Sequence, residues 1–258
     1  MSMTGVLRPG HVQIRVLDMD ESVKFYTDVM GLKPMGKDAQ GRAYFKTRAE
    51  RDHNSIILRQ ADRAGMDFFG YKVLDAATLD ALEKKLQARG VKTERIAAGE
   101  LLETGERVRF MIPTGHAIEL YADKTAVGSG VGCTNPDMDV LDAPGICPIR
   151  LDHALIYGTD LEGSRDLFTD VLGFTLVERA LLEDGKTDLG VWLTCSRTNR
   201  LNPSKVTDPN PSGSLIVSPG CRSSRAGLPS GFMISFILVL SSTNTDWPRP
   251  LSMPRSPR

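Results

Sequence analysis

The sequence has 258 residues, with 32 basic and 32 acidic side chains and a formal net charge of zero. This length accommodates one large domain or two ordinary ones, and the neutral balance excludes a general attraction to nucleic acid or to an anionic membrane. No apolar run is long enough to span a bilayer and no signal-peptide pattern opens the chain, so we expect a cytoplasmic protein with a small-molecule partner. The four cysteines lack metal-type spacing and are expected to be reduced and structural.

An internal repeat gives the expected organisation. The segment that starts at His11, HVQIRVLDMDESVKFYTDVMGL, recurs from His153 as HALIYGTDLEGSRDLFTDVLGF, with a constant offset of 142. So many identities without a gap indicate a duplicated module. We therefore expect an N-terminal domain over residues 5–123, a Gly/Pro-marked linker over 124–149 and a second copy that begins at residue 150.

Hydrophobic periodicity within the first copy predicts alternating strands and helices. In chain order, we expect a strand with Val12, Ile14 and Val16 inward, a helix with Val23, Tyr26 and Met30 ending at Gly31, strands over 43–46, 55–59 and 66–73, a helix with Leu79, Leu82 and Leu86 ending at Gly90, and strands over 91–96, 108–112 and 117–121. Each half reads βαβββ. The predicted fold class is α+β, in which paired βαβββ modules form a half-open barrel with the helices outside.

The composition changes near residue 195. Residues 1–195 contain all four histidines and 30 of the 32 acidic residues, whereas residues 196–258 contain nine of the fifteen prolines, thirteen serines and no Glu. Such a stretch can bury little surface to offset its ordering entropy. We expect residues 150–195 to form the first βαβββ unit of an incomplete second domain, and the Ser/Pro/Arg-rich tail over 196–258 to be disordered.

Four segments carry a family resemblance: RPGHVQIRVLDM, MDFFGYKVLD, RVRFMIPTGHAIELYAD and RLDHALIYGTDL. They resemble the vicinal oxygen chelate superfamily and, within it, the two-domain extradiol ring-cleavage dioxygenases of the catechol 2,3-dioxygenase type. The resemblance covers residues 5–195, three of that family's four βαβββ units. It implies a homotetrameric Fe(II) enzyme that chelates a catechol, binds O2 beside it and opens the ring next to the diol.

The resemblance also implies a metal held by two His and one Glu of the second domain, a ligand set that leaves positions open for the diol and O2. His153 matches the first ligand. The second projects to about residue 210, where the chain reads DPNPSGS, and the third projects to about residue 261, beyond the last residue of the sequence. The His and Tyr that this family uses for proton handling belong to the same missing unit. We therefore assign no catalytic residue and expect little or no dioxygenase activity.

The first domain offers only part of the same ligand set. His11 and Glu119 occupy the first and third ligand positions there, but the middle position falls at about Phe68, which cannot coordinate a metal. We expect His11 to be a polar residue at the start of a strand. Glu119 is expected to be a partly buried acid held by Arg107 or Arg109.

The remaining candidate residues have structural explanations. His116 follows a glycine in a turn and is expected to face solvent, and His53 is expected in an exposed loop. The acidic segments 18–22 and 159–163 are interpreted as helix starts, where their oxygens accept from free amide groups, rather than as cation sites.

Two explanations for the tail and three for the function stay open. The tail represents either natural divergence or a reading-frame shift near codon 195, and the simultaneous loss of His and Glu favours the frame shift. The protein is either a dioxygenase by family, a non-catalytic module that binds small aromatic molecules on the same fold, or an inert fragment. Metal content and catechol turnover distinguish these three functions.

Overall fold

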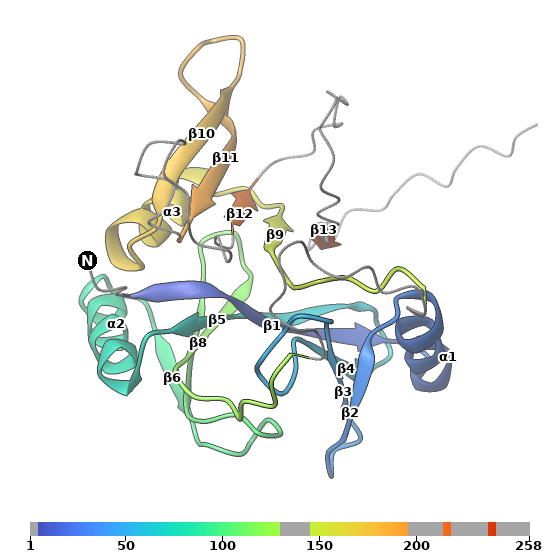
Figure 1. The fold of residues 1–258 in the computed structure, drawn as a ribbon. Coiled ribbons are helices and arrows are strands. Elements are labelled where there is room, and N and C mark those ends of the chain that lie inside the picture. Colours follow the sequence, from blue (N-terminus) through green and yellow to red (C-terminus); the bar gives the residue numbers. More distant parts are fainter. Residues whose placement is uncertain (1–4, 130–144, 196–213, 218–236, 241–258) are drawn as a thin grey trace, which may run out of the picture.

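The computed structural model describes residues 5–129, 145–195, 214–217 and 237–240, which form two β-sheets with helices against them (Figure 1). The first unit comprises β1 (Val6–Val16), α1 (Met19–Lys24), the π-helical turn η1 (Phe25–Val29), β2 (Lys33–Lys37), β3 (Ala43–Lys46) and β4 (Ile56–Gln60). The second comprises β5 (Gly65–Val73), α2 (Ala76–Ala88), β6 (Thr93–Ile96), β7 (Arg107–Met111) and β8 (Ala117–Tyr121). Among the helices described, none is long and apolar enough to cross a membrane.

The eight strands of these two units form one sheet in the order β2-β3-β4-β1-β5-β8-β7-β6. In each unit the first strand runs parallel to the last, β1 with β4 and β5 with β8, and the two units meet along antiparallel β1 and β5. The strand order of the second unit across the sheet is therefore the reverse of that of the first unit. This arrangement confirms the predicted α+β class with paired βαβββ modules.

Local sequence explains where the helices begin and end. The carboxylate of Asp18 accepts from the backbone N–H of Glu21 at 2.9 Å, and that of Asp75 accepts from the N–H of Thr78 at 2.7 Å. Each aspartate thereby satisfies one free donor at a helix start. Gly31 follows the first helix with φ of 67°, and Gly90 follows the second with φ of 81°, conformations that suit glycine at a helix end.

The sequence patterns missed strand β2. Its residues, KPMGK, are mostly exposed and include a proline and a glycine, so no apolar alternation marks the strand. It lies at the edge of the sheet and pairs only with β3 among the described strands. Edge positions tolerate proline because one side of the strand needs no ladder hydrogen bonds.

The second sheet repeats the beginning of the first. It contains β9 (His153–Ile156), α3 (Leu161–Asp166), the π-helical turn η2 (Leu167–Val171), β10 (Thr175–Leu181), β11 (Asp188–Thr194), β12 (Ser214–Val217) and β13 (Ile237–Leu240), with the strand order β10-β11-β12-β9-β13. The π-helical turns η1 and η2 are separated by the repeat offset of 142. Strand β12 runs parallel to β9, as β4 does to β1. However, β13 also runs parallel to β9, whereas β5, its positional counterpart, runs antiparallel to β1.

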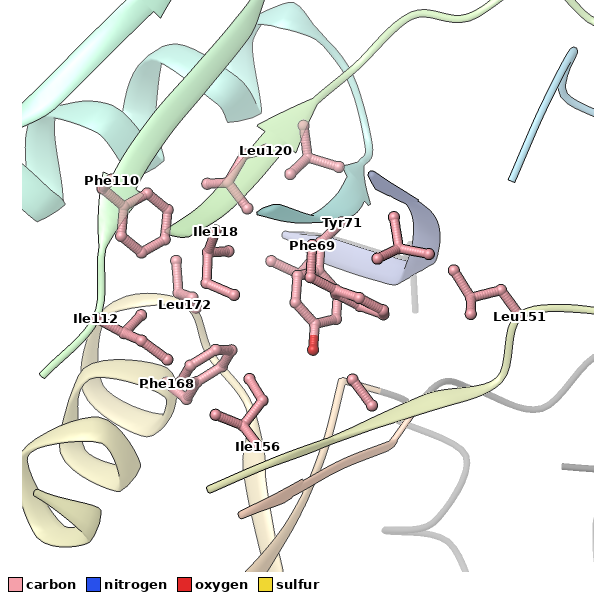
Figure 2. Close-up of a cluster of buried hydrophobic side chains, with 14 of the residues drawn as sticks. Phe69, Tyr71, Phe110, Ile112, Ile118, Leu120, Leu151, Ile156, Phe168 and Leu172 are labelled. Carbon is pink, nitrogen blue, oxygen red and sulfur yellow. The ribbon is translucent and has the colours of Figure 1, made fainter. Parts of the chain in front are cut away.

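We call residues 150–195, which contain β9, α3, η2, β10 and β11, the third unit. One continuous apolar core joins this third unit to the second unit (Figure 2). The ring of Tyr71 on β5 lies 6.1 Å from the ring of Phe168 and 5.4 Å from that of Phe174, and these two rings are 5.0 Å apart. Figure 2 also shows Ile156 and Leu172 facing the same cluster. Because these side chains exclude water together, the third unit is seated on the outer face of β5 and β8.

Candidate functional site

Three adjacent strands bring the two ligand-like residues of the first domain together. His11 on β1 pairs with Gly70 on β5, and Gly70 pairs with Glu119 on β8. The imidazole Nε2 of His11 lies 3.3 Å from Oε2 of Glu119, and both side chains are fully buried. A Cβ at Gly70 would lie 2.5 Å from that Nε2, so only glycine leaves room for the ring.

Two arginines hold the Glu119 carboxylate. Arg107 Nε donates to Oε2 at 3.0 Å, and Arg109 Nε donates to Oε1 at 2.8 Å. Burial would raise the pKa of Glu119, but its hydrogen bond with His11 and the two guanidinium charges keep that pKa below the ordinary value. The expected arginine contacts are both present, and the acid is completely rather than partly buried.

A lysine closes the other side of His11. Lys124 Nζ lies 3.0 Å from Nδ1 of His11 and donates to the backbone carbonyl of Asn54 at 3.2 Å. Burial lowers the pKa of Lys124 to about 7. Burial and the nearby ammonium lower the pKa of His11 to about 3, so its imidazole is neutral.

The first half-barrel therefore does not fit a metal. Phe68 occupies the space beside His11, with ring centroids 5.8 Å apart, and the Arg109 guanidinium lies 4.6 Å from the Phe68 ring centroid. Across the described ranges, no group of three His, Cys, Asp or Glu side chains converges on one point. His11 also lies in the middle of β1 and not at a strand start, because the strand extends back to Val6.

The expectation that His116 and His53 face solvent is wrong. His116 is 5% exposed, and its Nδ1 lies 3.0 Å from Oγ1 of Thr114. That turn is covered by the third unit, since Thr114 N–H donates to Ser164 Oγ at 3.2 Å. His53 is 8% exposed because the segment after β8 packs on its loop, where the His53 N–H donates to the Thr125 carbonyl at 2.9 Å.

His153, the predicted metal ligand, starts strand β9 and is 8% exposed. Its Nδ1 lies 3.2 Å from Oδ2 of Asp152, and Asp152 in turn forms an ion pair with Arg150 at 2.9 Å. Burial would raise the pKa of Asp152, but the contacts with His153 and Arg150 lower it. A carboxylate at Nδ1 fixes the ring with its proton there, which leaves the Nε2 lone pair for a ligand.

A second buried charge cluster escaped the sequence analysis. Arg8 binds Glu50 and Asp52, each at 2.8 Å, and Lys72 Nζ lies 2.7 Å from Asp52 Oδ1. These contacts attach the loop between β3 and β4 to β1 and β5. The partners lie up to 44 residues apart in the sequence, and no local pattern marks them as neighbours.

Comparison with known proteins gives a consistent result. Residues 66–125 match the model of the catechol 2,3-dioxygenase-like N-terminal domain. Metapyrocatechase of Pseudomonas sp. (strain CF600) is 46% identical over 182 residues, which cover 70% of this chain and 59% of that protein. The manganese-dependent 2,3-dihydroxybiphenyl 1,2-dioxygenase of Geobacillus genomosp. 3 is 26% identical over 188 residues, again 59% of its length. The chain thus spans about three fifths of these relatives.

Solved structures extend this match. The 2,3-dioxygenase LapB from Pseudomonas sp. KL28 superposes with a TM-score of 0.74 and 51% identity, over 86% of this chain and 73% of LapB. The Mn(II)-bound glyoxalase from Novosphingobium aromaticivorans gives a TM-score of 0.67 at 25% identity, over 84% of this chain and 63% of the glyoxalase. Fold, repeat and identity agree, and the chain belongs to the extradiol dioxygenases of the vicinal oxygen chelate superfamily.

Proposed function

We propose that this chain carries the first three units of an Fe(II)-dependent dioxygenase that cleaves catechol or alkylcatechols beside the diol, using O2, in the cytoplasm and as a homotetramer. Its membership of the extradiol dioxygenases supports the reaction class. The single observation that carries the site assignment is His153. It repeats His11, and its Nδ1 is held by a carboxylate as in metal-binding histidines.

The described residues do not fit a complete metal centre. Bound Fe(II) would supply positions for the chelating diol and O2, which requires a ligand set of two His and one carboxylate. His153 is the one member of that set that we assign. Among the described residues, no group of three His, Cys, Asp or Glu side chains could hold a metal ion. We therefore derive no catalytic step for this chain, and we infer that the other two ligands belong to a fourth unit.

The first half-barrel has a structural role in this proposal. Its Glu119 carboxylate is paired with Arg107 and Arg109, and Lys124 occupies the Nδ1 side of the neutral His11 ring. Its outer face provides the apolar surface on which the unit that carries His153 is seated. The domain boundaries at 5–123, 124–149 and 150–195 and the disordered tail over 196–258 follow from the sequence, and they remain part of the proposal. Apart from β12 and β13, the tail lies outside the described residues.

Metal analysis together with catechol turnover tests this function. The purified chain, reconstituted with Fe(II) under reducing conditions, should retain far less than one iron per chain and form no yellow ring-cleavage product. Full turnover would show that the ligand assignment is wrong. Binding of a small aromatic without metal would support the non-catalytic module instead, and the absence of both would support an inert fragment.

The role of His153 needs a chain with the fourth unit restored. In that chain, His153→Ala should abolish both iron retention and turnover, because one of three metal ligands is removed. His11→Ala is the matched control, since it removes the equivalent residue of the first copy, and it should leave iron content unchanged. Equal iron loss in both variants would contradict the assignment.

A further inference from the structure

The edge strand of the second sheet differs from its counterpart in the first. The repeat offset of 142 equates β2 with residues 175–179 of β10, and each strand pairs with one neighbour among the described strands. Strand β2 carries two lysines, a proline and a glycine in five residues. Lysine and proline keep an edge strand from pairing with another chain. The first sheet therefore ends in a protected strand.

Strand β10 lacks this protection. Its seven residues, TLVERAL, include neither proline nor glycine, and most of them are exposed. Leu176 stands at the position that Pro34 occupies in β2. Val177 is 57% exposed and Leu181 is 41% exposed. A long edge strand with exposed apolar side chains is a surface on which another strand can add.

The hairpin that β10 forms with β11 is also longer than its counterpart. In the first copy, Lys33 pairs with Lys46, 13 residues later, whereas Thr175 pairs with Thr194, 19 residues later. The second hairpin projects from the body of the molecule (Figure 1). Another chain can therefore approach this edge without a collision between the two bodies.

We propose that β10 is the docking edge for β10 of a second copy of this chain, paired antiparallel so that the two sheets become continuous. Such pairing uses the same edge on both copies, so one contact removes both free edges. Charge favours this occupant, because β10 carries Glu178 and Arg179 and has no net charge. Two copies of β2 would instead place four lysines along one contact, where like charges repel.

The pairing of β10 with β11 indicates where the new contact is centred. Irregularities of register flank residues 178–180, which pair regularly with β11. Because bulges bend an edge and hinder further pairing, we expect the contact to be centred on the regular stretch. An antiparallel register centred on Arg179 places Val177 of each copy opposite Leu181 of the other. The two copies of Arg179 then meet at the centre, and Asp188 Oδ1, 2.6 Å from each Nε, offsets their charge.

This proposal names one surface of the homotetramer in the proposed function, and to that extent it rests on that function. Sedimentation velocity of the full 258-residue chain over a concentration series tests it. The chain should associate as its concentration rises. In the assembly, amides over 175–181 should exchange with solvent at least about tenfold more slowly than in the dilute chain.

Variants of β10 test the edge itself. Val177→Lys with Leu181→Lys should raise the dissociation constant at least about tenfold, because it places like charges along the contact. The matched double variant, Met111→Lys with Val127→Lys, changes two similarly exposed apolar residues elsewhere and should associate as the parent does. Leu176→Pro copies the proline of β2 and should also weaken association. Hydrogen exchange over 153–172 checks that the third unit stays folded in each variant.

A chain that stays monomeric at every concentration up to its solubility overturns the proposal. Protection over 175–181 that does not depend on concentration also overturns it, since the chain's own residues would then cover the edge. Association that the β10 lysine variant leaves intact rejects this edge while the homotetramer stands. Iron content and turnover are measured on the same samples, so an inactive, iron-free chain that associates through β10 supports the docking edge while the proposed activity fails.

Discussion

His11 and His153 begin the two copies of one repeated segment, but their surroundings differ in a decisive way. At His11, the Lys124 ammonium faces Nδ1 and the Glu119 carboxylate faces Nε2, so the ring proton lies on Nε2. At His153, the Asp152 carboxylate faces Nδ1, which puts the proton on that atom. The first ring therefore has no Nε2 lone pair to offer a metal, whereas the second ring does.

This difference shows that a histidine repeated at a ligand position can bind a metal only if the neighbouring side chains leave its Nε2 lone pair available. The first half-barrel keeps two ligand-like residues, but Phe68 lies beside His11, and the Glu119 carboxylate is paired with Arg107 and Arg109. In the second sheet, Asp152 favours the tautomer in which Nε2 of His153, the proposed ligand, carries a lone pair.

The largest effect should follow loss of the acid in the first copy. Glu119→Gln removes the charge that compensates Arg107 and Arg109, and an uncompensated buried charge costs about 3–5 kcal/mol. Asp152→Asn, the matched change in the second copy, should cost about 1 kcal/mol because its partners are more exposed. Denaturant unfolding measures both, and equal losses in the two variants would contradict the comparison.

Gly70 gives a second way to disturb the first copy. A methyl group there must displace the His11 ring, and overpacking of this kind costs about 1–3 kcal/mol. His11→Ala should recover most of the loss in the double variant, since the clash is with that ring. If the losses of the two single variants simply add, the ring and the added methyl group do not meet.

The pH dependence of stability should also identify the first copy. His11 titrates with a folded pKa of about 3 against an ordinary 6.5, so the unfolded chain binds more protons between those values and stability rises with pH there. Lys124, at about 7 against 10.5, adds a second rise between pH 7 and 10.5. Each slope is at most about 1.4 kcal/mol per pH unit. Lys124→Met should remove the alkaline rise in urea titrations and narrow the acid rise, because the ammonium also lowers the pKa of His11. An unchanged alkaline slope would sink this account.

The smallest effect concerns the contact between the copies. Arg89, the C-cap of α2, and Asp170 on η2 form a 3.4 Å ion pair with both side chains about half exposed. Such pairs contribute about 0.2–1 kcal/mol and are screened by salt. Arg89→Ala should lower the free energy of unfolding by at most about 0.5 kcal/mol. A double-mutant cycle with Asp170→Ala measures the coupling energy of the pair, which should be smaller at 1 M salt than at low salt. A larger coupling would mean that the seat of the third unit is electrostatic rather than apolar.

The repeat and its periodicity predicted most of the fold because each signal is local. Alternation marked Val12, Ile14 and Val16, and glycines marked both helix ends. Strand β2 was missed because an exposed edge strand needs no apolar pattern. Within the acidic segment 18–22, which was interpreted as a helix start, Asp18 is the residue whose side chain accepts from a free amide group.

The candidate site was less predictable, because contacts between distant residues determine it. The sequence showed that Phe68 breaks the ligand set of the first domain, and that Arg107 and Arg109 stand close to Glu119. It gave no sign of Lys124 beside His11, a contact across 113 residues. The prediction that His116 faces solvent was wrong for the same reason. The third unit, which is distant in the sequence, covers the turn that carries His116.

The nucleotide sequence of the gene tests the central claim most directly, namely that the fourth unit holds the missing ligands. Read in an alternative frame downstream of about codon 195, it should restore a βαβββ unit. The repeat offset of 142 puts a His within a few residues of 210–214 and a Glu near 261–265, in a context like Pro113–Glu119. If no frame yields both ligands at these spacings, the tail is natural divergence and the proposed dioxygenase activity fails for this protein.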